Sequence, residues 1–201
     1  MSTVIFDLFP QRVIVHDCDM FHAHQSKLIN YCYEVKSQEQ AFSYTMVRQG
    51  WQSPNIACRE DFIPFLPFFN WNIEKCMSKY GFNVKEVKYE LQFVVINIGY
   101  PGGYHRSHIH PKCDISGVLW LKSSENCGDI VFENNDIYSQ TAIVQNLTCE
   151  MRESTLILPR CNFQPVEGRM LLFPPNLSHH VLINESIDDR LSIVFNIRFI
   201  E

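Results

Sequence analysis

The sequence predicts a fold of the α+β class, in which N-terminal helices pack against a β-sandwich or barrel. Two observations support this prediction. Apolar residues follow the helical period in the first part of the chain, at about residues 20–35 and 65–80. From Val84 onward, short β-prone runs succeed one another and are separated by Gly, Pro and Asn. Helices followed by a series of strands are typical of α+β proteins.

The N-terminal part is expected to contain two helices. The first, at about 20–35, follows Asp17 and Asp19, which are suitable N-cap residues. The second, at about 65–80, ends before Gly81, a residue typical of helix C-termini. Apolar residues at helical spacing form the predicted buried faces: Phe21, Leu28, Cys32 and Val35 in the first helix, and Phe69, Ile73, Cys76, Met77 and Tyr80 in the second.

The rest of the chain is expected to be extended or to form turns. Residues 3–15 predict short extended pieces interrupted at Pro10, and residues 50–54 predict a turn with Trp51 as its aromatic anchor. Strands are predicted throughout the second part of the chain. They cover residues 88–98, 115–122, 128–133, 154–158, 168–173, 179–184 and 190–200.

Length and composition indicate one ordinary globular domain. With 201 residues, of which 46% are apolar and 19% charged, the chain can bury a substantial core. We find no repeat, low-complexity segment or linker, so we expect a single domain over 1–201. Its helical part covers about 1–83 and its β core about 84–201. The net charge of −5 argues against nucleic acid as a partner, because such binding depends on Lys and Arg.

The cysteines and the first residues predict a cytoplasmic protein. Eight cysteines are scattered along the chain without a C-x-x-C pair, which favours free thiols in a reducing compartment over a disulfide framework. The N-terminus lacks the basic-then-apolar pattern of a secretory signal. No apolar run approaches the ~20 residues that a membrane span requires, so we expect no membrane association.

The most informative motif is the pair His108 and His110, which follows a Gly-rich turn at 101–103 and precedes a β-prone run at 115–121. In an extended chain, side chains two residues apart point to the same side, so both imidazoles are expected to face one interior. Imidazole binds divalent iron, zinc, copper and nickel, and two on one strand supply half a coordination sphere. The alternative is a pair of polar histidines at a strand end.

A later segment strengthens the metal hypothesis. In residues 168–196, a Gly turn leads into an apolar strand, His179 opens the next strand, and Arg190 and Ser192 follow on one strand face. The order H-x-H, distant His, R-x-S resembles the Fe(II)/2-oxoglutarate-dependent dioxygenases. It is most similar to the putative 2OG-Fe(II) oxygenases that carry H-x-H-P followed by S-G-V, here residues 108–111 and 116–118. Together the matching segments cover about 50–53 and 94–196.

The resemblance implies a double-stranded β-helix, also called a jelly-roll barrel, and a site inside it. His108, His110 and His179 are then the metal ligands, and Arg190 with Ser192 grips the far carboxylate of 2-oxoglutarate. A guanidinium suits this task because it forms two parallel hydrogen bonds with a carboxylate. The resemblance requires no separate catalytic acid or base. The alternatives are a surface ion pair of Arg190 with Asp188 or Asp189, and a space-filling role for Ser192.

One ligand departs from the pattern of the superfamily, which places Asp or Glu at the position of His110. Three neutral imidazoles also suit zinc or copper. Asp114 is an alternative source of a carboxylate, if the chain curls back; Glu133 and Asp129, expected on a solvated strand edge, come next. His105 and His180 are expected to be solvated or at the rim of the core, and His180 should face away from its neighbour His179. Asn97 is expected either to point inward or to serve a bulge or turn.

The resemblance therefore implies a non-haem Fe(II) enzyme that uses 2-oxoglutarate and dioxygen to hydroxylate an unidentified substrate, with release of succinate and CO2. A cupin-type metal enzyme is an alternative, because Gly103, His108, His110 and Asp114 imitate the first cupin motif. A barrel that binds a metal or ligand without catalysis is the other. The R-x-S after the last histidine favours the oxygenase. Trp51, Trp71 and Trp120 are expected in the core.

Overall fold

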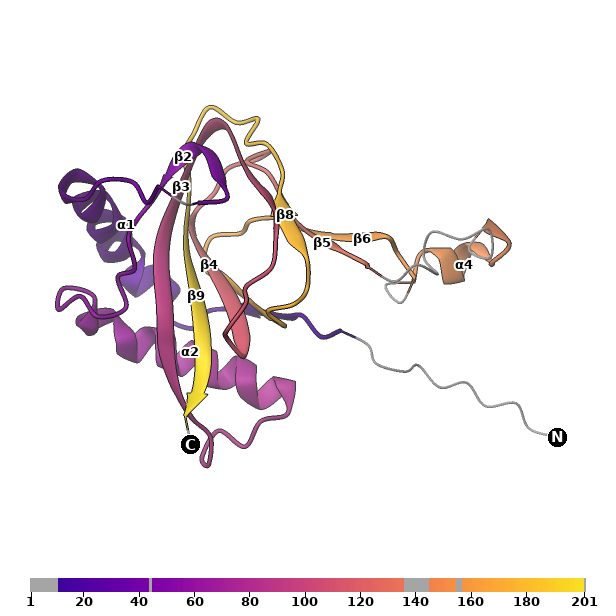
Figure 1. Cartoon of the computed structure of the whole chain (residues 1–201), viewed down its shortest axis with the longest axis horizontal. Helices are drawn as coiled ribbons and strands as arrows, with labels where there is room; N and C mark the ends of the chain where they lie inside the picture. The colour runs from indigo at the N-terminus through magenta and orange to yellow at the C-terminus, as the bar shows by residue number, and fades with distance from the viewer. Residues whose placement is uncertain (1–10, 44, 136–144, 155–156, 201) are drawn as a thin grey trace.

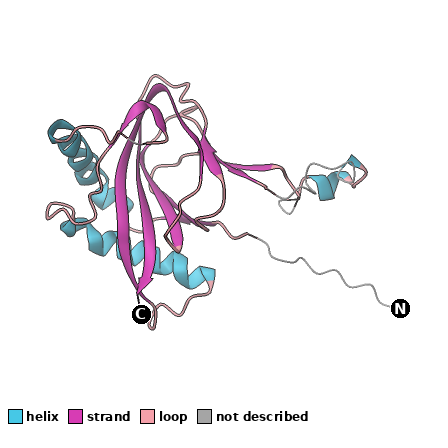
Figure 2. Cartoon of the chain, viewed as in Figure 1, coloured by secondary structure: helices cyan, strands magenta, loops and turns pink. Residues whose placement is uncertain are grey.

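The structure, a computed structural model, describes residues 11–43, 45–135, 145–154 and 157–200. Within them, every strand pair is antiparallel and the sheet curls into a jelly-roll half-barrel with α1 and α2 on one side (Figures 1 and 2). The predicted α+β class and double-stranded β-helix are thus confirmed. The helices are α1 (Phe21–Gln38), the 3-10 helix η1 (Ile63–Phe65), α2 (Leu66–Tyr80) and α4 (Cys149–Arg152). The strands are β1 (Ile14–Asp17), β2 (Val47–Gln52), β3 (Lys88–His108), β4 (Ile115–Lys122), β5 (Ile130–Glu133), β6 (Arg160–Phe163), β7 (Arg169–Phe173), β8 (His179–Val181) and β9 (Arg190–Ile200).

The long strand β3 belongs to both walls of the barrel. The strand order is β1-β7-β4-β9-β3-β8-β5-β6, and β2 also pairs with β3. Residues 88–99 of β3 pair with β9, whereas His105 and His108 at its end pair with β8. The pairing with β8 shifts register between these two histidines. The first part of β3 therefore lies at the centre of the sheet, and its end lies in the opposite wall of the barrel.

The central strands β3, β4 and β9 separate two faces by strict alternation, as expected for strands. One face is apolar and buried beneath the helices. Its residues are Val94, Ile96, Ile98, Leu119, Leu121, Leu191, Ile193, Phe195 and Ile197. The other face lines a cavity inside the barrel and includes polar groups. Its residues are Phe93, Val95, Asn97, Val118, Trp120, Arg190, Ser192, Val194 and Asn196.

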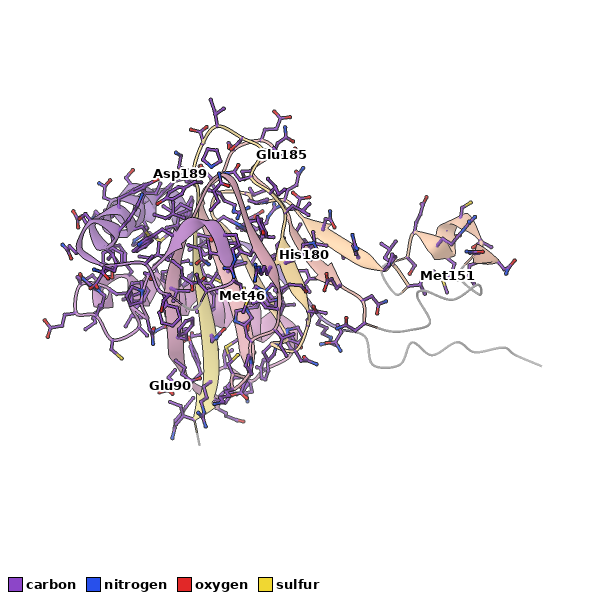
Figure 3. All side chains as sticks on the ribbon, turned by 45° about the horizontal axis from the view of Figure 1, so that its top comes forward. Met46, Glu90, Met151, His180, Glu185 and Asp189 are labelled. Atoms are coloured by element: carbon purple, nitrogen blue, oxygen red, sulfur yellow. The ribbon has the colours of Figure 1, made fainter. Side chains whose placement is uncertain are left out.

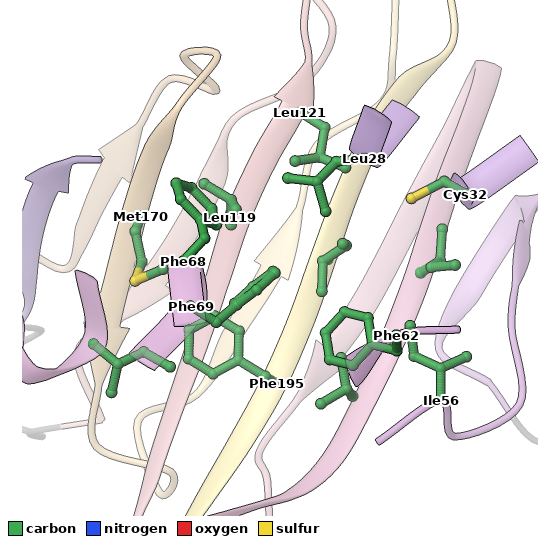
Figure 4. Close-up of a cluster of buried hydrophobic side chains, with 14 of the residues drawn as sticks. Leu28, Cys32, Ile56, Phe62, Phe68, Phe69, Leu119, Leu121, Met170 and Phe195 are labelled. Atoms are coloured by element: carbon green, nitrogen blue, oxygen red, sulfur yellow. The ribbon is translucent and has the colours of Figure 1, made fainter. Parts of the chain in front are cut away.

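Helices α1 and α2 complete the core on the first of these faces (Figure 4). The ring of Phe69 meets the ring of Phe195 edge to face, with centroids 5.9 Å apart. Phe195 has room because Gly117 on β4 lacks a side chain: a Cβ there would lie 2.4 Å from the Phe195 ring. Burial of each such side chain stabilises the fold by about 1.5–3 kcal/mol. The helices thereby hold the sheet in place behind the cavity.

Both predicted helices are confirmed, but the N-terminal cap of α1 differs from the prediction. Gly81 ends α2 in the left-handed conformation (φ 115°), and its N–H donates to the carbonyls of Met77 and Ser78. Asp17 and Asp19 do not cap α1, because Met20 occupies the N-cap position without a side-chain hydrogen bond. The two carboxylates instead form ion pairs with basic side chains. Asp17 pairs with Arg169 on β7, and Asp19 pairs with Lys75 on α2.

The N-terminal part contributes two strands that the predicted division at residue 83 omits. β1 pairs with β7, and β2 pairs with β3. The turn predicted at 50–54 is wrong, since Gly50, Trp51 and Gln52 form the end of β2. Gly50 allows this pairing, because a Cβ there would lie 2.5 Å from the Ile98 carbonyl oxygen. Of the pieces predicted at 3–15, residues 3–10 lie outside the described residues.

Most predicted strands are present with altered ends. β4 and β9 agree with prediction, β3 continues to His108, and β5, β7 and β8 are shorter than predicted. The strand predicted at 154–158 is not found among its described residues, because the N–H groups of Ile157 and Leu158 both donate to Ser154 in a turn. Residues 155–156 lie outside the described part. Pairing with β5 forms β6 a few residues later, and these two strands extend from the barrel toward α4 (Figure 1).

Two of the three tryptophans are in the core as predicted. Trp51 and Trp120 are buried, whereas Trp71 is 57% exposed and the prediction for it is wrong. Trp71 lies on the outer side of α2, where its Nε1 donates to Asp19 and Lys75 lies 5.0 Å from its ring centre. These contacts explain how a large aromatic side chain is accommodated at the surface.

The eight cysteines are free thiols in this structure, and their reduced state in the cell stays a prediction. Among the described residues, no helix combines the length and apolar character that crossing a bilayer requires.

Candidate metal centre

Three histidines from different parts of the barrel meet at one end of the cavity. His108 is the last residue of β3, and His179, the first residue of β8, is its partner in register. His110 lies just beyond β3, where its N–H donates to the Pro175 carbonyl oxygen at 2.8 Å. That backbone contact keeps the chain extended past the strand end, so both histidines of the H-x-H pair face the cavity.

The spacing of the three rings is suited to a shared metal ion. One nitrogen of each ring lies within 4.8 Å of the others. The Nε2 atoms of His110 and His179 are 3.3 Å apart. Two nitrogens bound at about 2.0–2.1 Å to one ion lie roughly 3.0–3.4 Å apart for angles near 90–109°. The observed separation therefore fits two ligands of one divalent cation.

Backbone contacts orient two of the rings. Nδ1 of His108 lies 2.7 Å from the Arg106 carbonyl oxygen, and Nδ1 of His179 lies 2.9 Å from that of Leu177. A carbonyl only accepts, so in each ring Nδ1 carries the proton and donates. The lone pair is then on Nε2, directed away from the backbone. This arrangement is typical of metal-binding histidines, whose other nitrogen is held by a backbone or carboxylate acceptor.

The surroundings keep these imidazoles neutral. His179 packs against the rings of Phe132 and Phe173, at centroid distances of 5.7 and 4.9 Å. Burial lowers the pKa of His179 to about 3 and that of His110 to about 4, and it also lowers the pKa of His108. All three rings therefore retain a free lone pair at neutral pH without competition from a proton, as a metal ligand must.

No carboxylate takes part in this cluster among the described residues, where the three histidines form it alone. Asp114, considered as a source of a carboxylate, is directed to β9: its Oδ2 accepts the N–H of Phe199 at 2.8 Å. Glu133 accepts hydrogen bonds from Ser107 and Ser178 on the outer side of the barrel, and the bond from Ser178 lowers its pKa. Glu133 is therefore more than a solvated edge residue.

Arg190 lies in the same cavity and is only 3% exposed. Its Nη1 donates to the carbonyl oxygens of Cys127 and Gly128, at 2.6 and 3.0 Å. Within the described part of the chain, no carboxylate forms an ion pair with it, so the alternative pairing with Asp188 or Asp189 is not found. Burial lowers its pKa to about 10, which still leaves it charged at neutral pH.

Glycines on two sides give the Arg190 guanidinium its space. A Cβ on Gly99 would lie 3.0 Å from Nη2, and one on Gly128 would lie 2.8 Å from Nη1. Gly128 also has a positive φ of 93°, a conformation that disfavours other residues. The fold therefore builds a narrow backbone cradle for a cation without supplying a counter-charge.

Polar side chains surround the guanidinium end of the cavity. Ser192 lies two residues after Arg190 on the same face of β9 and is buried. Asn97, its partner in register on β3, faces the cavity, which is one of the two predicted alternatives. Gln52 of β2 donates to the Asn97 side-chain oxygen at 2.8 Å. Asn97 thereby keeps its amide N–H2 group directed to other partners.

His105 and His180 were expected to be solvated or at the core rim. His180 lies on the outer side, 3.0 Å from Glu133, and Figure 3 marks it on β8. His105 differs: it lines the cavity, and its Nε2 is buried without a hydrogen-bond partner in the described structure. His105 and His108 are three residues apart on β3, so regular alternation would direct their side chains to opposite faces of the strand. The register shift between them changes this parity, so the sequence contained no direct signal for it.

The cavity that contains these groups has a volume of about 330 Å³. Among the described residues that line it, Arg190 is the only one with a charged side chain, and most of the others are apolar. Exposed apolar residues border it on the solvent side: Phe42, Met46 and Ile109 are between 41% and 49% exposed. Figure 3 labels Met46 at the start of β2. The site thus combines a nitrogen cluster, an isolated buried cation and an apolar approach.

This arrangement can hold a divalent cation at one point and an anionic group at another. Neutral imidazoles bind the metal without proton release, and an uncompensated guanidinium attracts a carboxylate in a low-dielectric cavity. A small molecule with a metal-chelating end and a distal carboxylate satisfies both demands.

Comparisons with known proteins agree with this geometry. A family model described as putative 2OG-Fe(II) oxygenase matches residues 94–196, slightly more than half of the chain, and this segment contains the three histidines, Arg190 and Ser192. A search of curated protein sequences found no significant match.

Solved structures of low sequence identity share the fold. A prolyl-4-hydroxylase from Pseudomonas putida superposes with a TM-score of 0.60 at 14% identity, covering 96% of this chain and 95% of that one. The 2-oxoglutarate-dependent carbocyclase SnoK from nogalamycin biosynthesis gives a TM-score of 0.67 at 11% identity, covering 93% and 79%. The epimerase SnoN, solved with Fe3+ and α-ketoglutarate, gives 0.65 at 10% identity, covering 92% and 78%.

Proposed function

The chain belongs to the putative 2OG-Fe(II) oxygenase family, and we propose that it is a 2-oxoglutarate-dependent dioxygenase that hydroxylates an as yet unidentified substrate. The observation that carries this proposal is the combination, in one cavity, of three convergent imidazoles with a buried guanidinium that forms no ion pair with any described carboxylate. A buried charge without a partner is costly to the fold, which favours a binding role over a structural one. Succinate and CO2 are the expected co-products.

His108, His110 and His179 would hold Fe(II) through one nitrogen each. When bound, Fe(II) supplies the redox chemistry that lets dioxygen oxidise a C–H bond. The side chains themselves bind and orient. Two backbone carbonyls hold the rings of His108 and His179 in place, and the aromatic residues around His179 exclude water from the ligands.

Arg190 would bind the carboxylate of 2-oxoglutarate that is remote from the metal. Its Nη1 is already engaged by two carbonyls, so the rest of the guanidinium remains for the ligand. Ser192 and the amide of Asn97 border the same end of the cavity, and the unpartnered Nε2 of His105 adds another polar contact. These groups position the co-substrate; none of them needs to act as an acid or base.

The apolar approach to the cavity supports an uncharged, partly apolar reacting group on the substrate. Phe42, Met46 and Ile109 border the solvent side, and the part of the lining that the structure describes contains no Asp, Glu or Lys. Together with the net charge of −5, this argues against nucleic acid as the substrate.

A cupin-type enzyme is the second candidate, because it would use the same histidines in a barrel. The two functions differ in their need for Arg190, since a cupin without 2-oxoglutarate has no carboxylate for a buried guanidinium. A metal-binding barrel without catalysis is the third candidate, favoured by the replacement of the usual carboxylate with His110.

The deciding experiment adds Fe(II) and then 2-oxoglutarate to the purified protein under anaerobic conditions. We expect a weak visible charge-transfer band that appears only with both components. Dioxygen is then admitted and succinate release is measured over a panel of candidate substrates. A band without any succinate supports the non-catalytic barrel, whereas Fe(II) binding without the band supports the cupin.

We also propose a cytoplasmic location, supported by eight scattered cysteines that form no disulfide framework. Every cysteine is expected to react with a thiol reagent after denaturation without reductant. Two or more unreactive cysteines would indicate an oxidising compartment instead.

A further inference from the structure

On the outer side of the barrel, one carboxylate joins the two strands that carry metal ligands. Oε2 of Glu133, at the end of β5, accepts hydrogen bonds from the hydroxyls of Ser107 at 2.8 Å and Ser178 at 2.7 Å. The two serine oxygens lie 3.0 Å from each other. The second carboxylate oxygen lies 3.0 Å from Nδ1 of His180. We call Glu133, Ser107 and Ser178 the carboxylate clamp.

Each serine of the carboxylate clamp is the direct neighbour of a candidate ligand. Ser107 precedes His108 on β3, and Ser178 precedes His179 on β8. Because neighbouring side chains of a strand point to opposite faces, the clamp lies behind the strands while the imidazoles point into the cavity. Because only one peptide bond separates each serine from the next histidine, a shift of either serine also moves that histidine.

The clamp lies where the strand ladder is short. β8 is only three residues long, and its ladder with β3 shifts register between His105 and His108. Beyond the register shift, the ladder therefore holds His108 opposite His179 at a single paired position at the end of the strand. Glu133 reaches across β8 from β5 to the end of β3, because β8 lies between these two strands. It is also tied in place itself, as its N–H donates to the Ser178 carbonyl.

We propose that Glu133 is a positioning residue that holds His108 and His179 at metal-binding distance through Ser107 and Ser178. This inference rests on the proposed function only in that the three histidines bind a divalent metal. It assigns a metal-related task to a carboxylate that is not itself a ligand. Hydrogen bonds to an ionised carboxylate are stronger than those between neutral groups, which suits a clamp at a strand end.

The test compares metal affinity in variants of the full-length protein. Fe(II) is titrated anaerobically, and Co(II) is used as a probe whose visible spectrum reports ligand geometry. Glu133→Ala is expected to weaken Fe(II) binding about 10–100-fold, the range typical of groups that orient ligands from behind. The Co(II) spectrum should change as well. Glu133→Gln retains an acceptor oxygen and should recover a large part of the affinity.

A matched control is Glu167→Ala. Glu167 also joins separate segments, since it accepts hydrogen bonds from Gln25 on α1 and from the backbone of Ser123. This variant removes a carboxylate with comparable contacts away from the histidines. It should alter the melting temperature as much as Glu133→Ala does, yet leave Fe(II) affinity and the Co(II) spectrum unchanged.

The serines test the route of the effect. Ser107→Ala combined with Ser178→Ala should reduce Fe(II) affinity about as much as Glu133→Ala, and the triple variant should lose little more, because all three changes break one clamp. If Glu133→Ala fails to fold, the serine pair alone decides, and unchanged affinity in it overturns the proposal. Fully additive losses would also overturn it, since Glu133 would then act by another route.

Failure of the inference differs from failure of the proposed function. Wild-type protein that binds Fe(II) but not 2-oxoglutarate contradicts the oxygenase, while a weakened Glu133→Ala variant still supports the clamp. Wild type that binds both, together with a Glu133→Ala variant of equal Fe(II) affinity, overturns the clamp alone. A wild type without any Fe(II) or Co(II) binding overturns both.

Discussion

The two faces of strands β3, β4 and β9 differ in almost every property although they share one backbone. The helix-covered face consists of aliphatic and aromatic side chains that are almost completely buried. The cavity face, one residue out of step, holds a guanidinium, a hydroxyl and two amides in comparable burial. The first face stabilises the barrel by excluding water, whereas the second directs polar groups into the cavity. Neighbouring residues of one strand therefore serve different tasks: one stabilises the fold and the next faces the proposed binding site.

The largest expected effect is on the metal. His179→Ala should abolish stoichiometric Fe(II) binding while the barrel remains folded, because two imidazoles are left and the larger apolar cluster lies on the helix-covered face. Metal content after anaerobic loading and a thermal melt check this result. The exposed His22 of α1 provides a control, and His22→Ala should bind Fe(II) as wild type does. If His179→Ala does not fold, the His179 side chain is required for the stability of the barrel, like the residues of the helix-covered face.

The next effect is on stability and should be confined to the helix-covered face. Phe195→Ala removes a fully buried ring that packs on Phe69, and such truncations cost about 3–5 kcal/mol in the free energy of unfolding. Denaturant unfolding measures this loss. Any variant that remains folded should bind Fe(II) with unchanged affinity. A loss below about 1 kcal/mol would show that the helices do not depend on this contact.

Arg190→Ala should affect the co-substrate and leave the metal alone. Removing a buried, bidentate charge partner should reduce 2-oxoglutarate affinity on the order of 10²–10³-fold. Fe(II) affinity should stay nearly unchanged, because Arg190 is not a candidate ligand. The melting temperature without ligand should also change little, because the loss of two hydrogen bonds to carbonyls is offset by removal of a buried charge that has no counter-charge among the described residues. Arg190→Lys should recover part of the affinity, since a point charge lacks the planar fork.

The control for this variant is Arg169→Ala, which removes the surface ion pair with Asp17. It should bind 2-oxoglutarate normally. Wild-type affinity for 2-oxoglutarate in Arg190→Ala would rule out the oxygenase and favour the cupin.

The smallest effect is expected at His105. Its Nε2 is buried and has no hydrogen-bond partner among the described residues, which costs stability in the free protein by about 1–3 kcal/mol. His105→Leu should therefore leave the ligand-free melting temperature unchanged or raise it, while 2-oxoglutarate binding weakens about tenfold through the loss of one hydrogen bond. A calorimetric titration and a melt measure both. A destabilised variant with normal 2-oxoglutarate binding would assign His105 to packing instead.

The sequence alone determined the fold class, both helices, the central strands and the five residues chosen for the site, because each has a local signal. Helical spacing marked α1 and α2, apolar runs marked β4 and β9, and ordered motifs marked the histidines, Arg190 and Ser192. The roles of those five residues stay proposals.

Only the tertiary structure decided what depends on distant partners. β2 forms because Gly50 fits against β3. Asp114 accepts a hydrogen bond from the backbone of β9, and Trp71 donates one to Asp19 at the surface. A register shift turns His105 into the cavity against the expected parity. Glu133 meets Ser107 and Ser178 across strands far apart in the chain. The period of a strand is a local property, whereas a bulge, a cradle or a clamp exists only once remote segments are packed together.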